Sequence, residues 1–323
     1  MFELHPIIWL QSWASPALTA VMNGISLLGY TRSYVAIAIF LAFGLRLRPA
    51  IALLVLLGLN GAVTDIAKTG AATPRPDMAG NGAVQALSLY GKELRQRDAD
   101  TPTQIEDSYG FPSGHVSATT AFAVGLAILF RWKRRGWILA VAWILAMAFS
   151  RVYLGRHFLG DVVGGVGVGL ATILVGFAVL KLAHLARESR AHDPWPAHRV
   201  MTVAIVLAGG ALLVGLPDAG DAGRLLGTAI GVLVLVHHDV FELAVSRRTR
   251  VILLFVATFA FGAAWGAMSL LLQEADPSSV SALRLAASAL PSAAVLLVPA
   301  YLPRRIIDAP LLTGISRGSA ARR

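Results

Sequence analysis

The sequence contains no cysteine and few charged residues. Without cysteine the chain can form no disulfide framework and can offer no thiolate to a metal or a substrate. Charged residues make up only 14% of the 323 residues, whereas hydrophobic residues make up 56%, which is not the composition of a soluble globular domain. The first six residues hold no basic cluster, so a cleavable signal peptide is not expected.

The sequence is instead a series of apolar stretches, most of them near the roughly 20 residues that a membrane-spanning helix needs. Residues 4–29 contain Trp9, Trp13 and Pro16 and are interpreted as an interfacial or re-entrant segment, with a full span as the alternative. The predicted fold is all-α, a polytopic membrane helix bundle. Clear spans are predicted at residues 32–45, 50–67, 114–130, 137–150, 158–180, 200–216, 225–241, 251–272 and 283–303.

A polar linker with two prolines divides these spans into two groups. Residues 1–185 form a core with an interfacial segment and five spans, and residues 186–199 form the linker. Residues 200–305 form a module of four further helices, which we expect to serve lipid access or association into homo-oligomers. Residues 306–323 form a basic tail.

The net charge of +10 has a clear distribution along the chain. Most basic residues fall in one set of connections, which the positive-inside rule places in the cytoplasm together with the carboxy-terminal tail. The loop 69–112 and the segment Ser150–Asp161 then lie together on the outer face. Because the charge excess orients a multi-pass protein, expected in the bacterial inner membrane, no nucleic-acid partner is needed to explain it.

The segment Ser150–Asp161 concentrates polar chemistry in an apolar chain. If it is helical from Gly155 onward, His157 and Asp161 are four residues apart and share a face. A carboxylate beside an imidazole fixes its tautomer and favours its protonated form. The guanidinium of Arg151 offers a planar fork for an oxyanion. Taken alone, the segment is equally compatible with a catalytic site and with a salt bridge at a helix start.

Two further polar segments lie on the same predicted face. Lys68 is followed after six residues by Arg75-Pro76, and Pro112-Ser113-Gly114-His115 opens a helix. The free N–H groups of a helix start favour an anion. Two histidines and three cations suit a phosphoryl group, one histidine attacking and the other protonating the leaving oxygen. No carboxylate cluster adjoins these segments, so metal-independent chemistry without a cofactor is predicted.

Together the three segments resemble the type-2 phosphatidic acid phosphatase family, which shares its site with vanadium haloperoxidases and glucose-6-phosphatases. The family pattern is Lys-x6-Arg-Pro, then Pro-Ser-Gly-His, then Ser-Arg-x5-His-x3-Asp, and the resemblance covers roughly residues 5–185. It implies that His157 is a nucleophile oriented by Asp161, and that His115 is the general acid. It also implies a set of phosphate-binding groups, namely Lys68, Arg75, Ser113, the Gly114 backbone and Arg151.

The expected activity is that of an integral membrane phosphatase acting on a lipid phosphate or diphosphate, such as phosphatidate, phosphatidylglycerophosphate or a polyprenyl diphosphate. A phosphotransferase with the same phosphohistidine and a sugar-phosphate phosphatase remain alternatives, as does a carrier or interaction protein with a vestigial site. Substrate-contact candidates are Lys92, Arg95 and Arg97 in the loop 77–111, and Arg156, which equally suits an arginine snorkelling to the interface.

Two further patterns concern helix packing. Asn60, in a predicted span, is expected to hydrogen-bond a neighbouring helix rather than to serve the site. Gly160-x3-Gly164 and Gly165-x3-Gly169 predict close helix approach that holds the His157 segment in place.

Overall fold

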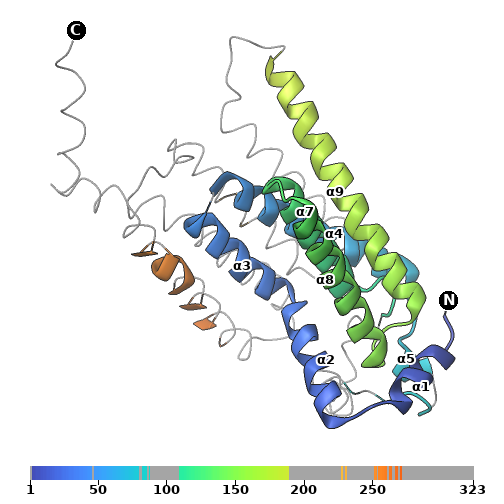
Figure 1. The fold of residues 1–323 in the computed structure, drawn as a ribbon. Helices are drawn as coiled ribbons and strands as arrows, with labels where there is room; N and C mark the ends of the chain where they lie inside the picture. Colours follow the sequence, from blue (N-terminus) through green and yellow to red (C-terminus); the bar gives the residue numbers. More distant parts are fainter. Residues whose placement is uncertain are drawn as a thin grey trace, which may run out of the picture. The chain divides into compact units, whose positions relative to one another are not determined.

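The computed structural model describes residues 2–45, 47–79, 82–85, 87 and 109–188, together with short helical pieces between residues 227 and 270. Across these residues the chain is helical and has no strand beyond one isolated bridge between Pro74 and Tyr109 (Figure 1). The all-α prediction is confirmed for this part. The linker after residue 188, the four predicted carboxy-terminal spans and the tail lie almost wholly outside the described residues.

The helices follow one another with short connections, except before α7. They are α1 (His5–Ser12), α2 (Pro16–Leu28), α3 (Thr31–Gly44), α4 (Leu47–Ala71), α5 (Pro76–Ala79), α7 (Gly114–Leu129), α8 (Arg134–Tyr153) and α9 (Leu159–Glu188). Contacts divide the chain into two compact units. The first consists of Met1–Ala38, Ala52–Pro194 and Ala211–Asp218, and the second of Ile39–Ile51, Trp195–Gly210 and Ala219–Arg323. Every described candidate site residue belongs to the first unit.

Three described helical segments are long and apolar enough to cross a membrane, namely Ala52–Ala71, Arg134–Tyr153 and Leu159–Ala178. They match the spans predicted at 50–67, 137–150 and 158–180. A fourth crossing is formed if Pro16–Leu28 and Ser33–Ala42, which are bent by 62° at the break between them, count as one. The apolar helices indicate a membrane protein.

Two of the predicted spans form helices that are too short to cross a bilayer alone. The helix α3 has 14 residues and α7 has 16, which at 1.5 Å per residue gives lengths of about 21 and 24 Å. A bilayer core is about 30 Å thick, so neither helix crosses it alone. Apolar composition identified both segments, but the positions of Gly29 and Ser113 set where the helices break and begin.

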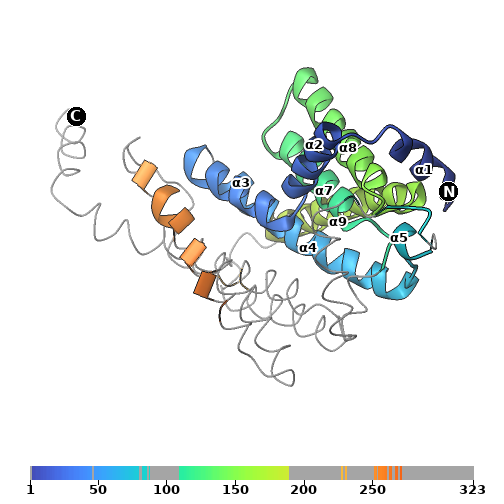
Figure 2. The ribbon, with the colours of Figure 1, turned by 90° about the horizontal axis from the view of Figure 1, so that it is seen from below.

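The helix α7 packs against both α8 and α9, and α2 packs against α8 (Figures 1 and 2). The α7–α9 approach is close because glycines line it, as predicted. A Cβ atom at Gly165 would lie 2.7 Å from the backbone oxygen of Ser113, and one at Gly169 would lie 2.7 Å from that of Ser117. Since those distances are too short for any side chain, glycine is required at both positions for this spacing.

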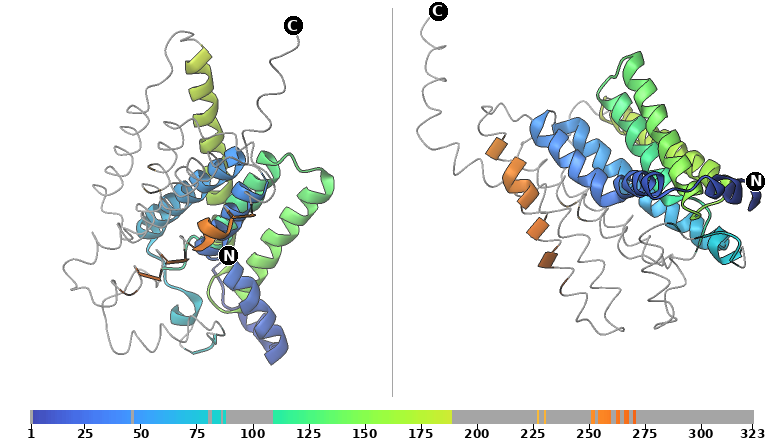
Figure 3. Two further views of the ribbon diagram at one scale, coloured as in Figure 1. Left: turned by 90° about the vertical axis from the view of Figure 1, so that its left-hand side faces the viewer. Right: turned by 60° about the horizontal axis from the view of Figure 1, so that its bottom comes forward.

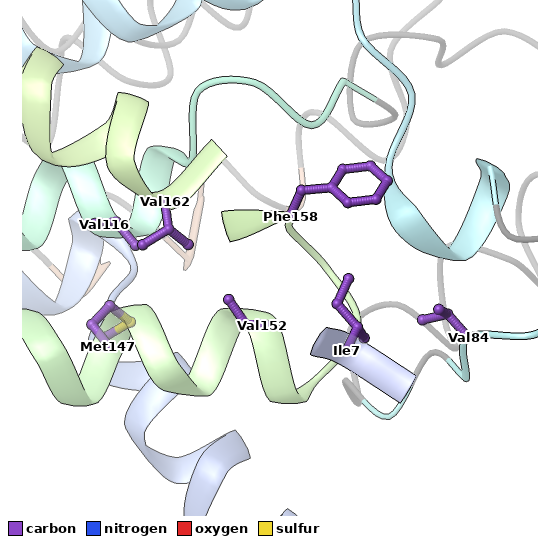
Figure 4. Packing of buried hydrophobic residues seen from close by; sticks show 7 residues of the cluster. All are labelled: Ile7, Val84, Val116, Met147, Val152, Phe158 and Val162. Carbon is purple, nitrogen blue, oxygen red and sulfur yellow. The ribbon is translucent and has the colours of Figure 1, made fainter. Parts of the chain in front are cut away.

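An apolar cluster lies at the end of α8, between the helices and the connections that hold the polar motifs (Figure 4). It joins α1, the loop after α5, α7, α8 and α9 through seven buried side chains: Ile7, Val84, Val116, Met147, Val152, Phe158 and Val162. Two of these adjoin candidate catalytic residues in sequence, because Val116 follows His115 and Phe158 follows His157. Packing of this cluster therefore fixes the backbone on which both histidines stand. The further views in Figure 3 show α1 and α5 near this end of α8 and α9.

Candidate active site

The third motif is positioned by the way α8 ends. Gly155 has a left-handed φ of +71°, its N–H donates to the Val152 carbonyl, and the N–H of Arg156 donates to the Arg151 carbonyl. This pair of bonds is the Schellman arrangement, in which a glycine reverses the chain just after a helix. A Cβ at Gly155 would also lie 2.6 Å from the Gln85 carbonyl. The turn places Arg151 on the last turn of α8 and His157 just before α9.

His157 faces Asp161 across the first turn of α9. The Nδ1 atom of His157 lies 3.4 Å from Oδ2 of Asp161, and the same oxygen accepts the N–H of Phe158 at 2.9 Å. The carboxylate of Asp161, the third residue of α9, thus caps the start of this helix and also faces the imidazole. Both side chains are almost fully buried, at 2% and 0% exposure. Since Nδ1 points at Asp161, Nε2 is the nitrogen turned away from it.

The charge state of His157 differs from the sequence-based expectation. Burial lowers the pKa of His157 well below its ordinary value, and the positive charges of Arg75, Arg151 and Lys68 lower it further. Asp161 alone would favour the imidazolium form, but desolvation and three cations outweigh one carboxylate. The imidazole is therefore neutral near pH 7, which is the form with a lone pair for attack.

The amino end of α7 forms the second part of the site. Ser113 precedes the helix with a fully buried side chain whose Oγ has no hydrogen-bond partner within the described residues. Its N–H donates to the Asp161 carbonyl at 2.9 Å, which ties α7 to α9. A Cβ at Gly114 would lie 3.8 Å from Nζ of Lys68, so the lysine ammonium lies beside the helix start. This is an arrangement of positive groups suited to an anion.

His115 occupies the first turn of α7 and is fixed by a relay of hydrogen bonds. Thr119 donates to the His115 carbonyl at 2.6 Å, Tyr34 and Thr119 are joined through their hydroxyls at 2.6 Å, and the Trp143 indole donates to Tyr34 at 3.3 Å. The Nε2 atom of His115 is buried and has no hydrogen-bond partner in the part of the chain that is described. It is thus available to a bound molecule.

The first motif meets the third through Arg75 and Arg156. Arg75 is buried and donates from Nη1 to the Arg156 carbonyl at 3.4 Å. Arg156 itself is 5% exposed and forms an ion pair of 3.1 Å with Asp77, whose carboxylate is also buried. This burial does not fit an arginine that snorkels to the interface, whereas a contact of Arg156 with the substrate stays a prediction. The pair joins the segment after Arg75-Pro76 to the turn before His157.

The helix α4 carries Lys68 on a polar face that is bonded to its neighbours. Asn60 accepts from Ser117 of α7 at 2.8 Å and from Thr172 of α9 at 3.4 Å, while Thr64 and Ser117 are joined at 2.8 Å. The prediction that Asn60 bonds neighbouring helices is confirmed. Because residues 60, 64 and 68 are four apart, these bonds set the rotation of α4 and hence the position of Lys68.

The structure brings together eight of the sequence-predicted residues: Lys68, Arg75, Ser113, Gly114, His115, Arg151, His157 and Asp161. Electrostatic interactions link both histidines to Lys68, Arg75 and Arg151. The other candidates, Lys92, Arg95 and Arg97, lie outside the described residues. Within the described ranges no group of three histidine, aspartate or glutamate side chains is placed to hold a metal ion.

Sequence reasoning missed contacts made by the amino-terminal segment and by Asp77. Ser26 of α2 accepts a hydrogen bond from Nη1 of Arg151, and the ring of Tyr30 lies 4.5 Å from that of His115. For Asp77 the sequence held a signal. This acidic residue directly follows Arg75-Pro76, and Arg156, a basic residue without an assigned role, directly precedes His157. For α2 the only signal was its polar and small residues, Asn23, Ser26 and Gly29, in an apolar helix.

Comparison with known proteins gives one family and several relatives. Residues 49–185 match the family described as the PAP2 superfamily. The relatives include lipid A 4′-phosphatase of Porphyromonas gingivalis, 35% identical over 90 residues, and undecaprenyl-diphosphatase BcrC of Bacillus subtilis, 38% identical over 77 residues. Phosphatidylglycerophosphatase B of Bacillus subtilis is 27% identical over 167 residues.

These similarities cover part of each protein. The matched segments amount to 28%, 24% and 48% of this chain, in the same order, and to 36%, 37% and 71% of the relatives. The chain therefore spans little more than a third of the length of the first two. No solved structure matches it.

Proposed function

Because residues 49–185 of this chain are a PAP2 superfamily domain, we propose that the protein is an integral membrane phosphatase that hydrolyses a lipid phosphate or diphosphate through a phosphohistidine. The observation that carries the proposal is the buried His157, whose Nδ1 faces Asp161 at 3.4 Å among Arg75, Arg151 and Lys68. A neutral, oriented imidazole surrounded by cations is what attack on a phosphate anion requires.

In the first step Nε2 of His157 attacks phosphorus, and the bond from phosphorus to the lipid oxygen breaks. The bound phosphate anion offsets the positive charges of Arg151, Lys68 and Arg75 around His115, so that His115 is protonated in the complex. It gives that oxygen a proton, and the lipid leaves as a neutral alcohol or as a monophosphate. The negative charge of the transferring group is met by Lys68, Arg75 and Arg151, and by the N–H groups at the start of α7. Asp161 stabilises the positive charge that His157 acquires.

In the second step water attacks the phosphohistidine. His115, now without its proton, takes one from the water as the new phosphorus–oxygen bond forms. The phosphorus–nitrogen bond breaks, inorganic phosphate leaves, and His157 returns to its neutral form. No metal ion takes part in either step, because the cations of the chain supply the electrostatic stabilisation.

The relatives favour a lipid as the substrate. The three proteins named above are called phosphatases of lipid A, of undecaprenyl diphosphate and of phosphatidylglycerophosphate. Their shared chemistry is a phosphoryl group on a membrane lipid, which suits a chain with apolar membrane-capable helices. The distribution of basic residues along the chain supports a site on the outer face of the membrane. Hydrolysis is proposed rather than transfer because water is the simplest acceptor for the phosphoryl group.

The test is phosphate release by the purified protein in detergent from a panel of phosphatidate, phosphatidylglycerophosphate and undecaprenyl diphosphate, with and without a chelator. We expect activity on at least one lipid, unchanged by the chelator, and its abolition by His157→Ala. His5→Ala is the matched control, because His5 is exposed on α1. Activity retained by His157→Ala contradicts the nucleophile, and loss of activity under chelation contradicts the metal-free chemistry. Transfer of labelled phosphoryl to a lipid acceptor instead of water indicates a phosphotransferase.

A further inference from the structure

The carboxyl end of α2 lies against the two parts of the site that act on opposite sides of the phosphoryl group. This end consists of Ser26, the helix-ending Gly29, and Tyr30 at the bend before α3. All three precede residue 49, where the family match begins. None belongs to the three motifs. Their contacts nevertheless reach Arg151 and His115.

Ser26 holds the guanidinium of Arg151. Nη1 of Arg151 donates to Oγ of Ser26, and both residues are about 4% exposed. A hydroxyl fixes the direction of the guanidinium without neutralising it. The Nε atom of Arg151 has no hydrogen-bond partner within the described residues and is buried, so the arginine keeps a donor for another group.

Gly29 and Tyr30 enclose the ring of His115. A Cβ at Gly29 would lie 2.8 Å from Cδ2 of His115 and 2.7 Å from Cε of Met147. The Tyr30 ring meets the imidazole edge-on, with centroids 4.5 Å apart and planes at 69°. The backbone of Gly29 has an ordinary helical φ of −81°, so its small size, and not its conformational freedom, is what the site uses.

We propose that the end of α2 is a positioning wall of the active site, in which Ser26 orients Arg151 toward the phosphoryl group and Gly29 with Tyr30 seats His115 against the leaving group. The inference rests on the proposed function, because it takes His115 as the general acid. It assigns two separate tasks to residues one turn apart. These tasks predict different kinetic signatures, one that depends on the leaving group and one that does not.

The signature for Gly29 depends on the leaving group. A methyl group added there moves the His115 ring and weakens proton donation to the departing oxygen. An alkyl alcohol is a poor leaving group and needs that proton, whereas a nitrophenolate leaves without it. Gly29→Ala is therefore expected to lower kcat/KM for a long-chain alkyl phosphate by about 10-fold to 10²-fold, part of the 10²–10⁴-fold range of general acid catalysis. For a nitrophenyl phosphate with the same alkyl chain, kcat/KM changes by less than about 3-fold.

The signature for Ser26 does not depend on the leaving group, because Arg151 contacts the phosphoryl group common to both substrates. Ser26→Ala is expected to lower kcat/KM for both by a similar factor of about 10, the scale of one hydrogen bond to a charged group. Ser26→Thr keeps the hydroxyl and is expected to retain the activity that Ser26→Ala loses. Tyr30→Ala removes the ring that meets His115 and is expected to follow Gly29→Ala.

The matched control for Gly29→Ala is Gly24→Ala, in the same helix, where nothing lies within 4 Å of the added Cβ. Variants are compared after size-exclusion chromatography in the same detergent. A Gly29→Ala effect equal for both substrates overturns the positioning of His115, since misfolding lowers both alike. A Ser26→Ala effect confined to one substrate, or absent, overturns the orientation of Arg151. If the wild type hydrolyses neither of these substrates and no lipid of the panel above, the proposed function fails; if it hydrolyses both substrates and the variants match it, only the inference about α2 fails.

Discussion

The variant Gly165→Ala, which adds one methyl group to α9, tests whether α9 holds the amino end of α7 in place. A Cβ there would lie 2.7 Å from the Ser113 carbonyl oxygen and 3.1 Å from Cβ of Val116. That oxygen already accepts the N–H of Ser117, and the Ser113 N–H donates to the carbonyl of Asp161, both at 2.9 Å. The backbone at Ser113 is therefore held on two sides and cannot move without lengthening one of these bonds.

The size of the effect follows from the distances. Ordinary van der Waals contact begins near 3.4 Å, so Gly165→Ala must separate the two backbones by about 0.5–0.7 Å. Over-packing of this kind costs about 1–3 kcal/mol of stability. A catalytic group displaced by 1 Å loses on the order of 10²-fold in rate, so a shift of about half that size at the phosphate-binding turn predicts a loss of about 10-fold.

The assay compares Gly165→Ala with Gly167→Ala, because nothing lies within 4 Å of a Cβ at Gly167. Both replacements gain the same helix propensity of about 1 kcal/mol, so their difference isolates the contact with α7. Phosphate release and thermal unfolding in detergent are measured for both. We expect Gly165→Ala alone to lose activity and to unfold at a lower temperature. Equal activity and equal unfolding temperature of the two variants would refute the argument that close packing of α7 against α9 requires glycine at position 165.

Three other changes test the site. Asp161→Asn keeps the shape of the side chain but removes the charge that faces His157, and should lower kcat by about 10²–10⁴-fold with little change in the temperature of unfolding. Because Arg75 is one cause of the lowered pKa of His157, Arg75→Gln should raise that pKa and shift the acidic limb of kcat/KM to higher pH, measured on one substrate from about pH 4.5 to 7; an unmoved limb contradicts the cationic cause. Arg156→Met should destabilise the protein by about 3–5 kcal/mol, and Asp77→Asn in the same chain should recover much of that loss in a thermal unfolding assay.

The sequence predicted the helical class and three of the membrane-capable helices, because long apolar segments are a local property. It did not predict that residues 32–45 fall short of a span. Gly29 and Tyr30 divide the apolar segment there, and whether a break ends a span or bends it depends on contacts with distant residues such as His115 and Met147.

The site residues were predictable where they stand in spaced motifs, and eight of them do meet. The protonation of His157 was not, since it depends on summing burial and three cations that come from different helices. The ion pair of Asp77 with Arg156 was not predictable either, because it joins two segments that are distant in the sequence. Charge and spacing locate a site in the sequence, but the balance among its charges exists only in the folded chain.

Arg151 and Arg156 show how that balance separates two similar residues. They stand five apart, both are buried, and both belong to the turn that ends α8. Asp77 meets Arg156 at 3.1 Å and neutralises it, so its charge stabilises the protein. Arg151 is met by the neutral hydroxyl of Ser26, which directs the guanidinium while leaving its positive charge for an incoming anion. On the proposed mechanism, the partner of each arginine therefore decides its role. Ser26→Asp would give Arg151 a carboxylate partner of the kind that Arg156 already has, and should abolish phosphate binding.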